Sequence, residues 1–305
     1  MKTTIFYHRD TDGWASAWCM FHYVVDVLQD DEPDLISVQY NEHFSDEMLE
    51  VCDGRRVIIV DFSFDGGMME TLAAYSKELI WIDHHKTAEG FVEFFAQERW
   101  KKKVQTRFDL GKAGCVLCWE FLCETSEDES VRDYPHASMV MQYIQDRDIW
   151  VWRHEPMSRW FTNAIISMDN DIEIWDELCG PKDTLMEDVL MKGEGIDEYK
   201  EVLTSMALRY AEFKEGVWYV NSPLLASEIG NELIEREGHN MSKSFVCVWA
   251  YKPDAVDKEG NPAPYVHQLR CGKTFDVGAV AKKFGGGGHP QAAGFSHQKP
   301  LWELL

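Results

Sequence analysis

The chain has 305 residues and is 45% hydrophobic, an ordinary globular composition that is large enough to bury two cores. Its formal net charge of −23 argues against a protein that grips long duplex nucleic acid by the backbone, since that requires a basic surface. The sequence holds no run of about 20 apolar residues and no signal-peptide pattern, so we expect a cytoplasmic protein that has no membrane partner.

The first 125 residues alternate between short apolar strands and helices. Strands are predicted at 4–7, 35–40, 57–60 and 79–82, and helices at about 14–28, 68–76 and 113–123. The strands at 4–7, 57–60 and 79–82 are continuous apolar runs, which is typical of parallel strands that are buried on both faces. The alternation predicts an α/β fold with a doubly wound, mainly parallel sheet.

The remainder of the chain has a different pattern. A polar loop at 126–135 precedes helical segments that continue to about Lys214 and indicate a connector. A strand at 218–220, a helix at 226–236, strands at 244–251 and 265–271 and a short helix at 276–284 predict a smaller α+β domain. We therefore expect a first domain at 1–185, a helical linker at 186–216 and a second domain at 217–305.

Clusters of Asp and His stand where three of the predicted strands end. Because the carboxyl ends of parallel strands line one crevice of such a sheet, these side chains should converge. So many carboxylates repel one another unless cations hold them, and we interpret the clusters as a metal site. Each Asp alone could instead cap a helix, but capping does not explain all of them together. The clusters are His8 with Asp10 and Asp12, then Asp61, then Asp83 with His84 and His85.

The ligand types indicate which metal this site prefers. Carboxylates and imidazoles without thiolates favour Mn(II), Mg(II), Fe(II) or Zn(II), and we take Mn(II) as the first choice, with Mg(II) possible. Five or more ligands exceed what one catalytic ion needs, whereas two ions about 3.5–4 Å apart can share them through a bridging carboxylate. Asp61, on the middle of the three strands, is the natural bridge, and a further acidic pair, Asp146 and Asp148, can supply a last ligand.

The eight cysteines are scattered, which suits a reducing compartment. Cys115 and Cys118 form a single Cys-x-x-Cys motif within an apolar helical run, with no second pair to complete a zinc site, so we expect them to pack in the core. Trp150, Trp152 and Trp160 could stack a nucleobase, but buried packing is the stronger expectation for such large apolar side chains.

The acidic balance of the chain reverses between Tyr265 and Lys299, where five basic side chains face one acidic side chain. Four consecutive glycines, Gly285–Gly288, precede His289 in this region. Unshielded backbone amides of this kind let a phosphate approach closely, while a flexible hinge is the alternative interpretation. An anion site beyond the metals is therefore expected here, and its basic residues are Arg270, Lys273, Lys282, Lys283 and Lys299.

Taken together, these motifs resemble the DHH phosphoesterase superfamily. The segment from Gly285 to Phe295 is similar to the signature of the DHH-associated C-terminal domain. The motifs therefore span both ends of the chain, and they occur in the same order as in the superfamily. In the N-terminal part, His8-x-Asp10-x-Asp12-Gly13 is similar to the first motif, Asp61 to the second, Asp83-His84-His85 to the third and Asp146 to the fourth, with Asp148 as the alternative.

The resemblance implies a two-domain enzyme with a catalytic, metal-binding N-terminal domain and a substrate-binding C-terminal domain. It implies that His85 contacts the phosphoryl oxygen or protonates the leaving group. Binding of substrate phosphates would then fall to Arg270, Gly287, Gly288 and His289. The implied metal ligands are His8, Asp10 and Asp61 for one ion and Asp12, Asp61, His84 and Asp146 for the other.

The expected function is a two-metal-dependent phosphoesterase that hydrolyses phosphodiester bonds of short oligonucleotides or small nucleotides. A phosphatase for 3′,5′-bisphosphates such as pAp, or a cyclic dinucleotide phosphodiesterase, is the alternative within the same chemistry. A nucleotide sensor without turnover is the alternative from another class, and an inorganic pyrophosphatase fits the glycine-rich signature less well. A homodimer is compatible with the sequence.

Overall fold

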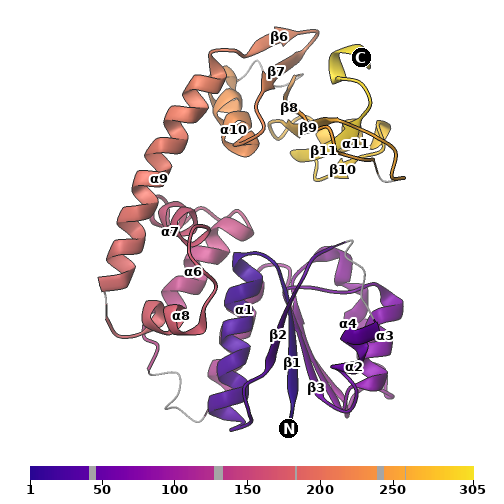
Figure 1. The fold of residues 1–305 in the computed structure, drawn as a ribbon, viewed down its shortest axis with the longest axis vertical. Coiled ribbons are helices and arrows are strands. Elements are labelled where there is room, and N and C mark those ends of the chain that lie inside the picture. Colours follow the sequence, from indigo (N-terminus) through magenta and orange to yellow (C-terminus); the bar gives the residue numbers. More distant parts are fainter. Residues whose placement is uncertain (41–45, 127–132, 183, 239–243, 258) are drawn as a thin grey trace. The chain divides into compact units, whose positions relative to one another are not determined.

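The structure is a computed structural model that describes residues 1–40, 46–126, 133–182, 184–238, 244–257 and 259–305 (Figure 1). The chain divides into two compact units, Met1–Ile196 and Asp197–Leu305, each with its own sheet. The segment 186–216, expected as a linker, contains most of helix α9 (Thr184–Leu208), and the division between the units falls within this helix. Within the described ranges, every helix is too short or too polar to cross a bilayer.

The first unit contains a five-stranded parallel sheet in the order β2-β1-β3-β4-β5, which confirms the predicted α/β fold. Four of these strands coincide with predicted ones, whereas β5 was not predicted because polar residues interrupt its apolar pattern. The strands are β1 (Thr3–His8), β2 (Asp34–Val38), β3 (Arg56–Val60), β4 (Glu78–Asp83) and β5 (Val104–Phe108).

Both faces of this sheet are covered by helices, and α1 lies on the opposite side from α3 and α4 (Figure 1). Consecutive residues of β3 alternate between two cores: Ile58 and Val60 pack with residues of α1 and α5, and Val57 and Ile59 pack with residues of α3. This alternation explains why the strand is apolar throughout. The helices are α1 (Thr11–His22), α2 (Asp46–Glu50), α3 (Gly66–Tyr75), α4 (Gly90–Phe95) and α5 (Gly114–Thr125).

The predicted helical connector forms several separate helices. α6 (Ala137–Asp148), α7 (Met157–Ile165) and α8 (Ile172–Cys179) add to the same core as α1 and α5. The helix predicted at about 14–28 ends as α1 at His22 and continues as a π-helical turn, Tyr23–Val27. Cys115 and Cys118 are buried in this core as free thiols, as predicted.

The second unit contains a six-stranded mixed sheet in the order β10-β11-β9-β8-β7-β6, in which β7 and β8 are parallel. Helix α10 (Ala226–Glu237) packs on one face of the sheet, and α11 (Val277–Lys283) belongs to the other core. The strands are β6 (Glu212–Lys214), β7 (Val217–Asn221), β8 (Phe245–Tyr251), β9 (Tyr265–Arg270), β10 (Gly287–Gly288) and β11 (Ala292–His297).

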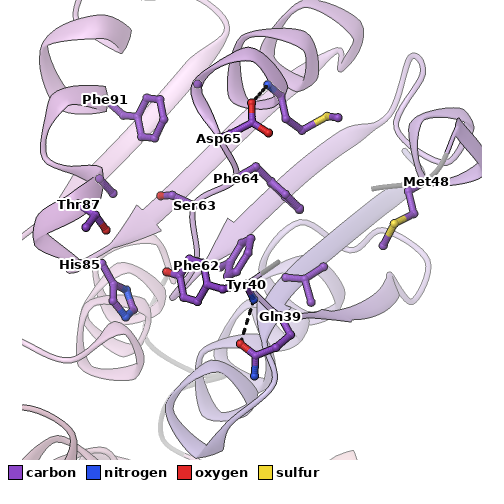
Figure 2. Close-up of a pocket in the computed structure, with 14 residues that line it drawn as sticks. Gln39, Tyr40, Met48, Phe62, Ser63, Phe64, Asp65, His85, Thr87 and Phe91 are labelled. Atoms are coloured by element: carbon purple, nitrogen blue, oxygen red, sulfur yellow. Dashed lines mark hydrogen bonds between the residues drawn. The ribbon is translucent and has the colours of Figure 1, made fainter. Parts of the chain in front are cut away.

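The carboxyl ends of the parallel strands lie together at one edge of the sheet in the first unit. A cavity of about 940 Å³ is found there, lined by residues that directly follow β2, β3 and β4 (Figure 2). The Asp and His clusters follow β1, β3 and β4 at this edge. The edge therefore combines a charged cluster with a sizeable hollow, as is expected of ligand sites in open α/β sheets.

Candidate metal centre

The turn from β1 into α1 positions the first cluster. Asp10 is the N-cap of α1, and its side chain accepts a hydrogen bond from the backbone N–H of Gly13 at 2.9 Å. A Cβ atom on Gly13 would lie 2.1 Å from the carbonyl oxygen of His8, so only glycine permits this close turn. The helix cap, which was the alternative interpretation of Asp10, is therefore present, and the other oxygen of Asp10 lies 2.6 Å from Nδ1 of His8.

Asp12 is buried on α1 and joins this helix to the start of α5. Its two carboxylate oxygens accept hydrogen bonds from the backbone N–H groups of Gly114 at 2.8 Å and Cys115 at 2.7 Å. These amides belong to the first turn of a helix, where N–H groups have no partner within the helix and favour an anion. Asp12 is thus held in a fixed position against the first turn of α5.

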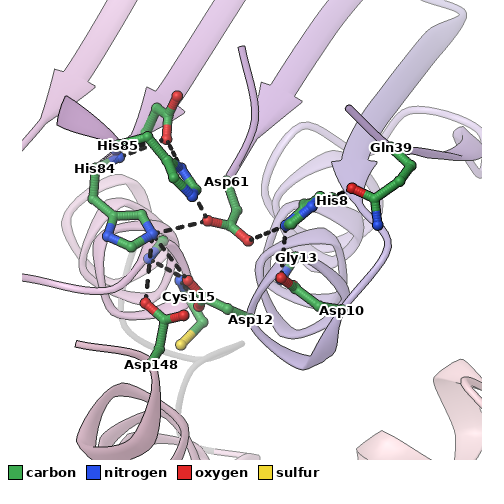
Figure 3. Close-up of polar contacts among 12 residues, drawn as sticks. His8, Asp10, Asp12, Gly13, Gln39, Asp61, His84, His85, Cys115 and Asp148 are labelled. Carbon is green, nitrogen blue, oxygen red and sulfur yellow. Dashed lines mark hydrogen bonds and ion pairs between the residues drawn. The ribbon is translucent and has the colours of Figure 1, made fainter. Parts of the chain in front are cut away.

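Asp61 follows β3 in a left-handed backbone conformation, with φ of 52°, and its side chain is 1% exposed. Aspartate is one of the few residues other than glycine that adopts this conformation, and such strain is concentrated at functional sites. The backbone N–H of Asp61 donates to the carbonyl oxygen of Ile82 at 2.9 Å, which ties the residue to β4. The conformation directs the Asp61 carboxylate into the space between the clusters (Figure 3).

Asp83 organises the two histidines that follow it. One of its oxygens accepts hydrogen bonds from the backbone N–H groups of His84 at 2.7 Å and His85 at 3.1 Å, and it lies 2.8 Å from Nδ1 of His85. The Ser63 hydroxyl donates to the other oxygen at 2.6 Å. Asp83 therefore fixes the backbone at His84 and orients the imidazole of His85. This role of Asp83 was not predicted from the sequence, although a carboxylate two residues before His85 was a usable signal.

The side chains from these turns meet around Asp61 (Figure 3). One oxygen of Asp61 lies 3.0 Å from Nε2 of His84, and the other lies 3.8 Å from Nδ1 of His8. Nε2 of His84 is also 3.5 Å from a carboxylate oxygen of both Asp12 and Asp148. Within each of three overlapping groups the ligand atoms lie within 4.8 Å of one another: His8, Asp10 and Asp61; Asp12, His84 and Asp148; and Asp61, Asp83, His84 and His85.

Repulsion among the carboxylates of this cluster favours the binding of cations. Burial, followed by repulsion from Asp12 and Asp10, raises the pKa of Asp61 well above its ordinary value. The same causes raise the pKa of Asp148 to about 8. Burial lowers the pKa of His84, which favours the neutral imidazole that a metal requires as a ligand. One buried oxygen of Asp61 receives no hydrogen bond from any described residue, so this donor set fits divalent ions of the hard or borderline type.

The structure corrects the preference for Asp146 as the last ligand. The Asp146 carboxylate accepts hydrogen bonds from the backbone N–H groups of Arg153 at 2.6 Å and His154 at 3.0 Å, and from the Ser158 hydroxyl at 2.7 Å. Asp146, in the last turn of α6, is thus engaged by donors from the loop that follows α6 and from α7. Asp148, the alternative, is the residue whose carboxylate faces His84.

Three of the four residues expected to bind phosphate line one cavity of about 750 Å³ in the second unit, namely Arg270, Gly287 and Gly288. The Arg270 guanidinium donates to the Ser227 hydroxyl and to the carbonyl oxygen of Leu269, each at 2.9 Å. Its buried Nε has no hydrogen-bond partner among the described residues. His289 is exposed and is absent from the lining of this cavity.

The glycine run is explained largely by backbone packing and only in part by the cavity. A Cβ atom on Gly286 would lie 2.2 Å from the carbonyl oxygen of Gly294, and one on Gly288 would lie 2.5 Å from Cα of Ala293. Both clashes arise from the close approach of β10 to β11. A Cβ atom on Gly287 would meet nothing within 4 Å, so this glycine has open space beside it.

One further expectation needs revision. Trp150 and Trp152 were expected to be buried, but they are 55% and 38% exposed, and both have a left-handed backbone conformation. Gln39, which directly follows β2, was not predicted as a site residue, and its side-chain oxygen lies 2.8 Å from Nε2 of His8. Gln39 orients the imidazole from the side opposite to Asp10, as outer partners of metal-binding histidines do.

Comparison with known proteins places this geometry in a family. Residues 2–143, which contain the three strand-end clusters, match the model of the DHH family, N-terminal domain. Residues 2–143 form a DHH-family N-terminal domain. The resemblance predicted from His8, Asp10, Asp12, Asp61 and the Asp83-His84-His85 motif is thereby confirmed.

Other comparisons extend over nearly the whole chain. Protein R106 of Acanthamoeba polyphaga mimivirus, described as uncharacterized, is 25% identical over 300 residues; the match covers 94% of this chain and 65% of the relative. RecJ of Thermus thermophilus in complex with Mn²⁺ is similar with a TM-score of 0.55 at 14% identity, covering 99% of this chain and 50% of RecJ. PggH of Vibrio cholerae, a pGpG-specific phosphodiesterase, has a TM-score of 0.52 at 13% identity, covering 97% and 93%. These likenesses show a shared fold.

Proposed function

We propose that the protein is a metal-dependent phosphoesterase that hydrolyses phosphodiester bonds of short oligonucleotides or small nucleotides. The observation that carries the proposal is the position of the Asp61 carboxylate, which presents one oxygen to His84 and the other to His8. A carboxylate that faces two ligand groups at once is what a pair of neighbouring ions requires. The DHH domain and the fold shared with a Mn²⁺-bound RecJ support the same conclusion.

We assign the ligands by the groups in which they lie. His8, Asp10 and Asp61 hold one ion, and Asp12, Asp61, His84 and Asp148 hold the other. Mn(II) is our first choice and Mg(II) the second, because the donors are oxygens and imidazole nitrogens. Two such ions, when bound, lower the pKa of a water molecule and offset the charge that develops on the phosphoryl oxygens.

His85 is the residue that we assign to proton transfer. Its Nδ1 lies 2.8 Å from Asp83, and this contact outweighs burial and raises the pKa of His85, so the imidazole is held in a protonated or readily protonated form. With Nδ1 engaged, Nε2 is the atom that can donate a proton to the leaving oxygen or a hydrogen bond to a phosphoryl oxygen. Asp83 acts through His85 by fixing its orientation.

The second unit is proposed to bind the substrate. Arg270, whose Nε has no hydrogen-bond partner among the described residues, lines the same cavity as Gly287, which has open space beside it, and this combination suits a phosphate group. We expect Arg270→Ala to raise the Michaelis constant for short oligonucleotides while the turnover number stays close to that of the wild type. An unchanged Michaelis constant would refute the assignment of this anion site.

The proposal is tested with a substrate panel. Metal-stripped protein is supplied with Mn²⁺ or Mg²⁺ and given 5′-labelled dinucleotides, pAp, cyclic dinucleotides and tripolyphosphate. We expect metal-dependent hydrolysis that is fastest with dinucleotides, and Asp61→Asn serves as the inactive control. Preference for pAp or for a cyclic dinucleotide would establish the alternative within the same chemistry. Binding without turnover across the panel would show a nucleotide sensor and contradict the proposal.

A further inference from the structure

The cavity at the edge of the parallel sheet adjoins the metal centre. Gln39 and His85 line the cavity and also take part in the centre, through His8 and Asp83 respectively (Figure 2). A phosphate ester held at the metal centre would therefore carry one of its attached groups towards this hollow. At about 940 Å³ the cavity lies within the range of small-molecule sites, so it has ample space for such a group.

One wall of this cavity consists of aromatic rings in mutual contact. The ring of Tyr40 lies 4.6 Å from that of Phe62 in a tilted arrangement, and Phe62 lies 4.9 Å from Phe64, edge to face. Phe91 of α4 contributes a further ring to the lining (Figure 2). Aromatic linings of this kind bind flat, uncharged rings through ring contacts and desolvation.

The charges around the cavity exclude a different class of occupant. Its described lining contains the carboxylate of Asp65 and no lysine or arginine. One Asp65 oxygen accepts hydrogen bonds from the backbone N–H groups of Gly67 and Met68 at the start of α3, so this carboxylate is held in place. A chain of inorganic phosphates would meet repulsion here, whereas a neutral ring would not.

The cavity is also connected to the catalytic histidine by hydrogen bonds. Nε1 of the buried Trp81 donates to the Ser63 hydroxyl at 3.0 Å, and this hydroxyl donates to Asp83 at 2.6 Å. Asp83 in turn orients His85. Because Ser63 lines the cavity, an occupant would rest against the same network that positions the proton donor.

We propose that this cavity binds the nucleobase of the nucleotide whose phosphate lies at the metal centre. The inference rests on the proposed function and narrows its substrate class to esters that carry a nucleoside, in contrast to inorganic polyphosphates. Four aromatic side chains supply the stacking surface, and continuity with His85 places the base next to the reacting phosphate.

The test fills the cavity without touching the metal ligands. Thr87 lines the cavity on the short 3₁₀ turn Lys86–Ala88, and Thr87→Trp adds bulk there. Glu89→Trp is the matched control, because Glu89 is exposed, lies two residues further on and is outside the lining. Tyr40→Leu, which removes a stacking ring from a residue that is 40% exposed, is the second variant.

Each variant is assayed with Mn²⁺ on a dinucleotide and on two analogues in which one of the two nucleosides is replaced by an abasic ribose. For the dinucleotide, we expect kcat/KM to fall about tenfold or more in Thr87→Trp and Tyr40→Leu, the scale of one lost base-stacking contact. For the analogue that lacks the bound base, the wild type should already be slow and the variants should match it. Glu89→Trp should behave as the wild type throughout.

Equal losses on all three substrates, or no loss on any, would overturn the nucleobase assignment while leaving the phosphoesterase proposal in place. Tripolyphosphate hydrolysis as fast as that of the dinucleotide would overturn it as well. If the wild type hydrolyses none of these substrates with Mn²⁺, the proposed function fails, and the inference fails with it.

Discussion

Asp61 and Asp146 are both buried carboxylates of the first unit, yet their surroundings have opposite effects on their charge. Burial raises the pKa of Asp146, but hydrogen bonds from Ser158, Arg153 and His154 outweigh this effect and lower it overall. For Asp61, burial and repulsion from Asp12 and Asp10 act together and raise the pKa. Burial alone therefore does not mark a ligand: a carboxylate that is supplied with N–H and O–H donors stabilises the fold, whereas the charged form of one that faces other carboxylates is destabilised unless a proton or a cation neutralises it.

The sharpest way to break this comparison is Asp61→Asn. Asparagine also adopts the left-handed conformation, so the fold should be retained. We expect metal-dependent hydrolysis to fall about a thousandfold or more, because the shared ligand is lost. In EDTA at pH 8 the variant should unfold at a higher temperature than the wild type, because a carboxylate with a raised pKa destabilises the folded state above its unfolded pKa. Retained hydrolysis would contradict the shared role.

A smaller effect is expected for Asp148→Asn. The variant loses one oxygen ligand of a single ion, so the Mn²⁺ concentration for half-maximal activity should rise about 10- to 100-fold. The free energy of unfolding without metal should not fall, because the Asp148 carboxylate is itself disfavoured by burial and by Asp12. Metal titrations of activity and denaturant unfolding in EDTA measure the two quantities. An unaltered Mn²⁺ dependence would exclude Asp148 from the ligand set.

Asp146→Asn should instead lower the stability of the fold and leave the Mn²⁺ dependence unchanged. The amide has one acceptor oxygen for three donors, and its NH₂ group would face N–H groups, so we expect the free energy of unfolding to fall by about 1–3 kcal/mol. The Mn²⁺ dependence of the remaining activity should stay as in the wild type. Denaturant unfolding checks the first result and metal titration the second. A large shift in metal affinity with unchanged stability would restore Asp146 as a ligand.

The smallest expected effect is on the pH dependence of stability, and it concerns His22, a buried group whose charge is compensated by two carboxylates. Nδ1 and Nε2 of His22 lie 2.6 Å from Asp26 and 2.8 Å from Asp176. Burial acts to lower the pKa of His22, but the two carboxylates outweigh it and the pKa is raised. The stabilisation is therefore fully present below the unfolded pKa and is lost as the pH rises through the raised folded pKa.

Comparison of the wild type with His22→Gln tests this dependence. The stability advantage of the wild type, measured by denaturant unfolding, should be larger at pH 6 than at pH 9. An advantage that is constant over this range would show that the carboxylates do not hold His22 in its charged form.

Sequence reasoning located much of the centre because the chemistry stands at the ends of recognisable strands. The apolar runs of β1, β3 and β4 predicted a parallel sheet, and that prediction placed Asp61 beside the clusters that precede and follow it. The sequence pattern did not show whether Asp146 or Asp148 is the ligand. These residues are two positions apart at the end of α6, so they point in different directions, and tertiary contacts decide which of them meets His84.

Other features escaped prediction because they depend on contacts that are distant in sequence. The exposure of Trp150 and Trp152 follows from the left-handed turns after α6, which no apolar pattern signals. The clashes that require glycine at 286 and 288 arise only when β10 pairs with β11. Strand β5 was missed because polar residues occupy much of an edge strand.

Gly114 limits which substitutions are tolerated next to the metal centre. A single methyl group there would approach Cβ of Asp61 to 2.8 Å. Asp61 cannot retreat, because its backbone is tied to Ile82, and α5 cannot retreat, because Asp12 holds its first amides. Replacement of Gly114 by alanine, ordinarily a mild substitution, should therefore disturb the site. Sequence variation among homologues should be confined to surfaces that lie further from the strand ends.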